Sequence, residues 1–301
     1  MNLYSGLNLF FISLFTRLVP RGLHAPFAFL AAVTVYFAGG NCRRGVRRNL
    51  QIVTGRRRVE RLVLSCFYKY ALNWCDVLLM FRLKGEHLFR LIGRREGGDF
   101  LKDALGQGRG AIIISPHFGN WELGGLGLIE KEGYRLNVLT FREPDAAVND
   151  LREKIRSKRG VGFIYVDRND PSPLAVIEAV NALRRNEIVA LLGDRDGSSY
   201  TVTLDFFGRP TPIPLGAAYL ALASGAPVIP AFIPLEGARY ATILEEPIRF
   251  RSGTGGHDEA IREGTEKIIR VFERYIRYYP DQWYNLFDYW GDRNPTHEKE
   301  L

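Results

Sequence analysis

The sequence feature that most limits the fold is the run of three isoleucines at residues 112–114, which lies between Gly110 and Ser115-Pro116. A short apolar run between turn residues is typical of a strand buried on both faces. Such strands occur in parallel sheets, because helices cover both sides of those sheets. The run therefore predicts a central strand at Ala111–Ser115 of an α/β protein.

Strand and helix patterns alternate along the following sequence. This alternation favours a largely parallel central sheet flanked by helices. A long helix is also expected at residues 58–83, and another at residues 259–278. Further strands are expected at residues 136–141, 162–166, 188–192, 202–206, 228–233 and 240–244, and helices at 120–129, 145–158, 173–185 and 215–224.

The first 40 residues are apolar and precede a basic stretch. Residues 9–19 and 26–38 are apolar segments, and eight arginines follow within residues 41–61. Each apolar segment is shorter than the roughly 20 residues that a membrane-spanning helix needs. We therefore expect membrane-surface or re-entrant helices, with the arginines at anionic headgroups on the cytoplasmic side.

The net charge of +8 indicates an anionic partner. No helix-turn-helix, zinc-finger or RNA-binding signature accompanies the charge, so nucleic acid is not the expected partner. Cys42, Cys66 and Cys75 lack metal-binding or redox spacing and are expected to be reduced, structural thiols. The five histidines show no paired metal-ligand spacing, so no metal is expected.

A histidine and a carboxylate follow the central strand. His117 lies on the turn, and Glu122 lies in the first turn of a helix that Asn120 is expected to cap. A parallel strand ends at the crevice where open α/β sheets bind ligands. The pair suits general-base activation of a hydroxyl, with Glu122 holding the second ring nitrogen. Alternatively, His117 caps backbone groups and Glu122 interacts with the helix dipole.

A second polar group follows the strand expected at residues 188–192. Asp194, Arg195 and Asp196 stand at its carboxyl end. Two carboxylates that flank an arginine are costly to bury without a functional reason. The position therefore favours a role in a site.

The segment HFGNWE, residues 117–122, resembles the His-x4-Asp/Glu signature of glycerolipid acyltransferases. It has the form typical of bacterial lipid A late acyltransferases, the lauroyl and myristoyl transferases. RRGVRRNL, TFREP, GDRD and FFGRPTPIPLGAAYLALASGAPVIPAF resemble further blocks of that family, in the same order, from about residue 43 to 290. The end QWYNLFDYW differs from the QWxWxHxRW of lipid A enzymes. With GDRD and DFFG, it looks closer to the branch that acylates phosphatidylinositol mannosides.

The resemblance implies a glycerolipid-acyltransferase-like fold, with a membrane-associated segment at residues 1–40 and an acyltransferase domain at 41–301. It implies acyl transfer from an acyl carrier protein or CoA thioester, as co-substrate, to a hydroxyl of lipid A or a related glycolipid. The place implied is the cytoplasmic face of the inner membrane. No cofactor is expected beyond the thioester, and no acyl-enzyme, because the chain has no G-x-S-x-G segment.

The resemblance also implies roles for individual residues. His117 is the expected general base and Glu122 its partner. Arg142 and Arg168 are expected to contact phosphate groups, or else to form surface salt bridges. Backbone N–H groups near Gly119 and Asn120, or an arginine, are expected to bind the oxyanion. The residues expected to line the cleft are Asp194, Arg195 and Asp196.

Other functions fit some of these features. A lysophospholipid, ornithine-lipid or phosphatidylinositol mannoside acyltransferase would use the same His-Glu pair on a different acceptor. A hydrolase would use the pair to activate water. A non-catalytic peripheral protein would use only the basic, apolar N-terminus to bind anionic lipid. Acceptor-dependent consumption of the thioester separates acyl transfer from the last two.

Overall fold

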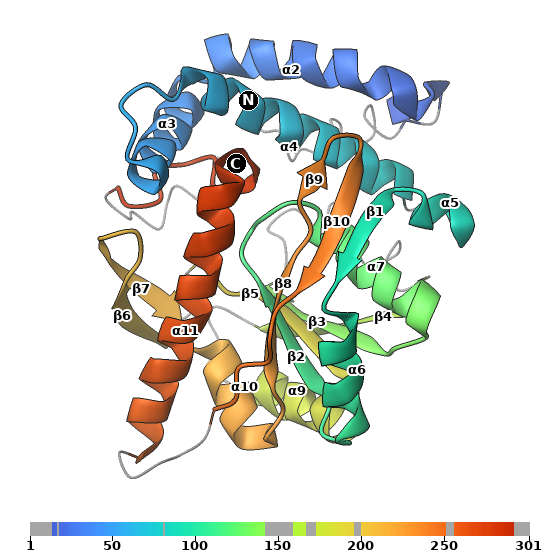
Figure 1. Cartoon of the computed structure of the whole chain (residues 1–301), viewed down its shortest axis with the longest axis vertical. Helices are drawn as coiled ribbons and strands as arrows, with labels where there is room; N and C mark the ends of the chain where they lie inside the picture. Colours follow the sequence, from blue (N-terminus) through green and yellow to red (C-terminus); the bar gives the residue numbers. More distant parts are fainter. Residues whose placement is uncertain are drawn as a thin grey trace.

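The computed structural model describes residues 14–16, 18–80, 82–141, 159–166, 173–195, 200–250 and 256–291. In this part of the chain a mostly parallel sheet lies between helices (Figure 1). Helices α2 (His24–Ala38) and α4 (Glu60–Met80) lie across one end of the sheet. The expected α/β class with a largely parallel sheet is confirmed.

The sheet has strand order β1-β10-β8-β2-β5-β3-β4, and the short β9 pairs with β10. Strand β2 is central and is parallel to both neighbours, β5 and β8. The one change of direction on this path is the antiparallel pair β8–β10. The strands are β1 (Ile92–Glu96), β2 (Ala111–Ser115), β3 (Leu136–Phe141), β4 (Val161–Val166), β5 (Ile188–Leu192), β8 (Val228–Phe232), β9 (Leu235–Glu236) and β10 (Arg239–Leu244).

Helices cover both faces of the sheet. Helices α9, α10 and α11 lie on one face, and α6 and α7 lie on the other (Figure 1). Short helices also follow α4 and α11. The helices on the two faces and these short helices have the bounds α5 (Glu86–Phe89), α6 (Gly98–Gly106), α7 (Trp121–Glu132), α9 (Leu174–Arg184), α10 (Gly216–Ser224), α11 (Gly256–Tyr278) and η2 (Pro280–Gln282).

Strand β2 is buried along its whole length, as expected. Successive side chains of a strand point to opposite faces of the sheet. Ile112 and Ile114 pack in the cluster that includes α9, α10 and α11. Ala111 and Ile113 pack in the cluster that includes α6. Each position from 111 to 114 therefore takes an apolar side chain, which explains the continuous apolar run; only the last residue, Ser115, is polar.

The N-terminal helices form a layer of their own. The short η1 (Arg21–Leu23) leads into α2. Helix α3 (Gly40–Thr54) carries the first four of the eight arginines at residues 41–61. Helix α2 packs along α4 through small residues such as Ala28 and Ala32, which are buried. Its other face exposes large apolar side chains, among them Phe27 and Phe37.

Residues 21–38 and α4 are each long and apolar enough to cross a membrane, by length and composition alone. Half of the apolar window of α4 is buried inside the protein, as in a core helix, against 17% for residues 21–38. The expectation that the N-terminus lies on or enters the membrane without spanning it stays a prediction.

Some elements differ from the expectation. The segment at residues 202–206 is β6 (Thr201–Asp205), but it pairs with β7 (Pro210–Pro214) in a separate two-stranded sheet. Strand β7 was not among the expected strands. Among the described strands it pairs only with β6, so it is an edge strand, where its prolines are tolerated. Strand β1 and helix α6, on either side of Gly97, were also missed. The helix expected at residues 145–158 lies outside the described residues.

The three cysteines are free thiols. Burial raises the pKa of the Cys66 thiol far above its ordinary value. Burial, with the charge of Asp76, raises the pKa of Cys75 to about 12. Because the thiolate is the reactive form, both groups are inert at neutral pH. This agrees with the structural role expected for them.

Candidate active site

The turn after β2 carries His117 and is held by main-chain hydrogen bonds. The N–H of Gly119 donates to the carbonyl of Gln282 at 3.0 Å. The next N–H, of Asn120, donates to the carbonyl of Ile233 at 2.9 Å. These bonds tie the turn to the end of β8 and to the C-terminal segment, residues 282–290. The position of His117 is therefore set by β2, by the end of β8 and by the C-terminal segment together.

Helix α7 begins directly after this turn. The side-chain oxygen of Asn120 accepts from the N–H of Leu123 at 2.9 Å, so the expected N-cap is confirmed. The ring of Trp121 packs edge-on against His117, with the ring centroids 5.7 Å apart. The histidine therefore lies on the loop just before the helix, as the sequence predicted.

We expect Gly119→Ala to lower the free energy of unfolding by about 3 kcal/mol or more. Gly119 has a φ of +59°, and a Cβ there would lie 2.1 Å from the carbonyl oxygen of Ile233. Gly133→Ala is the matched control, since Gly133 has a φ of +70° and open space around it. It should cost only the left-handed strain, about 1–2 kcal/mol. The free energies of unfolding are measured in urea. If both variants lose the same amount, the contact with the Ile233 carbonyl oxygen has no role in the loss.

The register of the sheet brings His117 next to Asp194. In the parallel pair β2–β5, Ser115 lies opposite Leu192. His117 and Asp194 each follow two residues later, so they leave the sheet side by side. Nδ1 of His117 lies 2.6 Å from Oδ1 of Asp194, and the same oxygen accepts from the His117 N–H at 3.0 Å.

The carboxyl group of Asp194 is completely buried. Burial alone would raise its pKa, since desolvation penalises the charged form. The charge and hydrogen bond of His117 oppose this, together with the charge of Arg195 and a hydrogen bond from Trp283. The net effect holds the pKa of Asp194 well below its usual range, so the group is a carboxylate at neutral pH.

The second oxygen of Asp194 is held by the C-terminal segment, residues 282–290. Oδ2 accepts from the indole N–H of Trp283 at 2.8 Å and from the amide of Asn285 at 3.2 Å. The Tyr289 hydroxyl donates to the main-chain carbonyl of Asp194. The sequence analysis did not predict these contacts. The sequence signal that could have indicated them is Asn285, a polar side chain in the middle of an aromatic run.

This arrangement suits general-base chemistry. An ionised carboxylate only accepts hydrogen bonds, so Nδ1 of neutral His117 carries the proton. The lone pair of the ring is then on Nε2, which is the nitrogen able to take a proton from a hydroxyl. The carboxylate also stabilises the imidazolium that forms.

A sequence profile of the family described as bacterial lipid A biosynthesis acyltransferases matches residues 7–291. The chain belongs to this family. The resemblance seen in the sequence is thereby confirmed, and the protein is an acyltransferase.

Among curated proteins, this acyltransferase is similar to phosphatidylinositol mannoside acyltransferases. It is 28% identical to the one from Mycobacterium tuberculosis over 262 residues, covering 85% of this chain and 79% of that protein. It is also 28% identical to the one from Mycolicibacterium smegmatis over 250 residues, covering 81% of this chain and 78% of that protein.

In this acyltransferase the carboxylate on Nδ1 of His117 is Asp194, the position that we had expected only to line the cleft. Glu122 lies half-buried in the first turn of α7. The task of holding Nδ1 and its tautomer, which the sequence assigned to Glu122, thus falls to Asp194. A role for Glu122 in the site stays a prediction.

The expectation that N–H groups near Gly119 and Asn120, or an arginine, bind the oxyanion stays a prediction, and the N–H groups of these two residues have other partners in this structure. Each already donates to a main-chain carbonyl, of Gln282 and Ile233 respectively. Releasing either would leave a buried carbonyl without its hydrogen bond, which costs about 1–3 kcal/mol. These two residues shape the turn and carry the N-cap.

Of the expected basic residues, the structure describes Arg195. Its Nε donates to the side-chain oxygen of Asn285 at 2.8 Å, and Nη2 donates to the carbonyl of Tyr284 at 2.7 Å. Its guanidinium also lies over the ring of Phe287. Arg195 therefore supports the C-terminal segment beside Asp194. The remaining expected site residues, Arg142, Arg168 and Asp196, lie outside the described residues.

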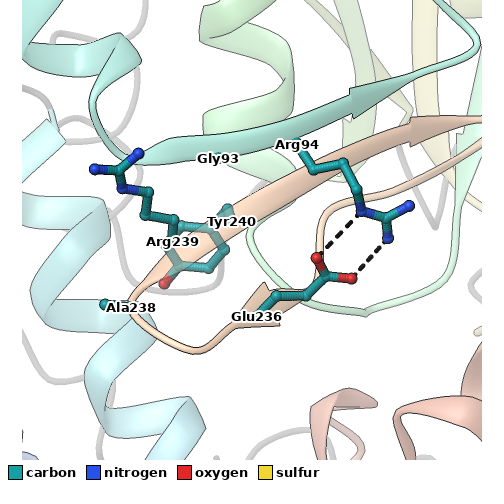
Figure 2. Close-up of a pocket in the computed structure, with 6 residues that line it drawn as sticks. All are labelled: Gly93, Arg94, Glu236, Ala238, Arg239 and Tyr240. Atoms are coloured by element: carbon teal, nitrogen blue, oxygen red, sulfur yellow. Dashed lines mark hydrogen bonds and ion pairs between the residues drawn. The ribbon is translucent and has the colours of Figure 1, made fainter.

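A cavity of about 360 Å³ lies by strands β1, β9 and β10 and contains none of the expected site residues (Figure 2). Arg94 lines it and is paired with Glu236 at 2.7 Å and with Glu96. Its charge is thus already balanced by the protein. In the described ranges, no three or more His, Cys, Asp or Glu side chains gather as a metal site. The His117–Asp194 pair remains the candidate catalytic centre.

Proposed function

We propose that this acyltransferase moves a fatty acyl chain from an acyl thioester to a hydroxyl of a membrane glycolipid, with His117 as general base. The observation that carries the proposal is the 2.6 Å contact between His117 and the fully buried Asp194, at the end of the central strand. Family membership supports the reaction class. The thioester is carried by acyl carrier protein or CoA, and no other cofactor is proposed.

The proposed reaction is direct. Nε2 of His117 takes the proton of the acceptor hydroxyl while its oxygen attacks the thioester carbonyl carbon. The tetrahedral intermediate collapses as the C–S bond breaks, and the imidazolium returns the proton to the leaving sulfur. The products are the acylated lipid and a free thiol. Asp194 stabilises the imidazolium between these steps.

We further propose that the N-terminal layer faces the cytoplasmic side of the inner membrane. Leu30 and Phe37 of α2 are 63% and 74% exposed, which is unusual for large apolar side chains that face water. Arg56, Arg57 and Arg58, in the loop between α3 and α4, are also exposed. Arginines near apolar side chains suit a surface of anionic headgroups.

The acceptor that we favour is a phosphatidylinositol mannoside-like glycolipid, ahead of lipid A. The names of the similar curated proteins support this choice. The C-terminal QWYNLFDYW, which differs from the lipid A pattern, also supports it. Phosphate contacts from Arg142 and Arg168 are part of the proposal, because guanidinium groups bind phosphate in a bidentate way.

Mass spectrometry of the lipid products tests this function. The purified protein is given acyl carrier protein or CoA thioesters, with phosphatidylinositol mannosides, a lipid A precursor or a lysophospholipid as acceptor. We expect a new ester of the mannoside that the His117→Ala protein does not form. Thioester loss without an acylated lipid would indicate a hydrolase, and no loss with any thioester would indicate a lipid-binding protein.

A further inference from the structure

The carboxylate of Asp194 is held from two sides. Oδ1 accepts two hydrogen bonds from His117, and Oδ2 accepts one from Trp283 and one from Asn285. The terminal torsion of an aspartate is broad in the absence of such contacts. The two donors on Oδ2 therefore fix the plane of the carboxylate, and this plane directs Oδ1 at the histidine ring.

The two donors are themselves fixed. The guanidinium of Arg195 can only donate, so the oxygen of the Asn285 amide must face it and the NH₂ group must face Asp194. The indole of Trp283 is 4% exposed and packs among aromatic rings, including Phe206 and Tyr289. Neither side chain has room for another orientation.

A buried side chain of α3, Asn49, bonds to the segment that carries these donors. Its NH₂ group donates to the carbonyls of Asn285 and Phe287 at 3.0 and 2.7 Å, and its oxygen accepts from the N–H of Tyr289 at 2.9 Å. The side chain thus satisfies main-chain groups that have no strand partner. Helix α3 thereby holds the C-terminal segment against the site.

We propose that Trp283 and Asn285 are positioning residues, which orient Asp194 so that it holds His117 in the reactive tautomer. These two side chains then affect the reaction only through Asp194 and His117. The expected loss of kcat rests on the proposed function. The expected change in the tautomer of the His117 ring does not, because it can be measured without substrate.

The test compares two substitutions of the same kind. Trp283→Phe removes the N–H that holds Asp194 and keeps an aromatic ring. Trp290→Phe is the matched control, because its Nε1 donates to Thr211 at 3.0 Å and it packs in the same cluster, 5.7 Å from the Trp283 ring. Both are measured by steady-state kinetics and by nitrogen-15 NMR of the His117 ring. The ring signals are assigned by their loss in His117→Ala.

We expect Trp283→Phe to lower kcat about 10- to 100-fold with little change in KM, as for a lost hydrogen bond to a charged group. The neutral His117 ring should gain the Nε2–H tautomer at the expense of Nδ1–H. Trp290→Phe should leave both kcat and the ring signals near those of the wild type. If Trp283→Phe does not fold, Asn285→Ala takes its place.

An unchanged His117 spectrum in Trp283→Phe would overturn the inference, as would an equal loss of kcat in Trp290→Phe. The proposed function fails separately, if the wild-type protein forms no acylated lipid. In that case the NMR comparison still decides whether Trp283 positions Asp194.

Discussion

Replacing His117 with alanine is expected to lower kcat for acyl transfer by about 10²- to 10⁴-fold, the usual contribution of a general base. Without the imidazole, the acceptor hydroxyl has no group to take its proton during the attack on the thioester. KM for the thioester should change little, because the ring acts on the reacting hydroxyl. The measurement is the initial rate of product formation, with the acceptor identified by mass spectrometry.

His87→Ala is the matched control, since His87 is exposed on α5. It should keep wild-type activity. Circular dichroism and thermal unfolding must show that the His117→Ala protein is folded. A folded His117→Ala protein that retains activity within a few fold of the wild type would refute the assignment of His117 as the base.

Asp194→Asn is expected to lower kcat by about 10²- to 10⁴-fold, through the tautomer of His117. The groups of Trp283 and Asn285 at Oδ2 only donate, whereas Nδ1 of His117 can also accept, so we expect the amide oxygen of the new side chain to take the Oδ2 place. Its NH₂ group then faces Nδ1 of His117, which is forced to accept. The ring proton moves to Nε2, and the base is lost. Nitrogen-15 NMR of the ring and the rate of acyl transfer both report this change.

The same substitution should change how stability depends on pH. The pKa of Asp194 is lowered in the folded protein, so its carboxylate stabilises the fold at any pH above its unfolded value, about 4. That stability is lost as the pH falls below this value toward the folded pKa. The wild type should therefore exceed Asp194→Asn in free energy of unfolding at pH 7, and by less at pH 3.

Asp99→Asn serves as the control for the pH dependence, because Asp99 is exposed. The free energy of unfolding of Asp99→Asn should follow that of the wild type at both pH 7 and pH 3. A difference between wild type and Asp194→Asn that is the same in urea unfolding at pH 7 and pH 3 would contradict the account given for the carboxylate.

Most strands of the sheet, though not β1 and β9, and the start of α7 were predictable because their signals are local. Strand β2 needs apolar side chains on both faces, and that need appears as a continuous run of isoleucines. The N-cap of α7 is a contact between Asn120 and a residue three positions later. By contrast, β7 contains prolines that argue against a strand, and only its pairing with β6 makes it one.

The sequence by itself determined the α/β class, the family and the place of His117 at the end of a buried strand. Tertiary structure alone decided which carboxylate meets that histidine. Strand β5 lies beside β2 although β3 and β4 come between them in sequence, and this places Asp194, 77 residues away, on Nδ1. Trp283 and Asn285 lie about as far again along the chain, 89 and 91 residues from Asp194. Local patterns record interactions over a few residues, whereas strand order and the packing of the C-terminal segment depend on the whole folded chain.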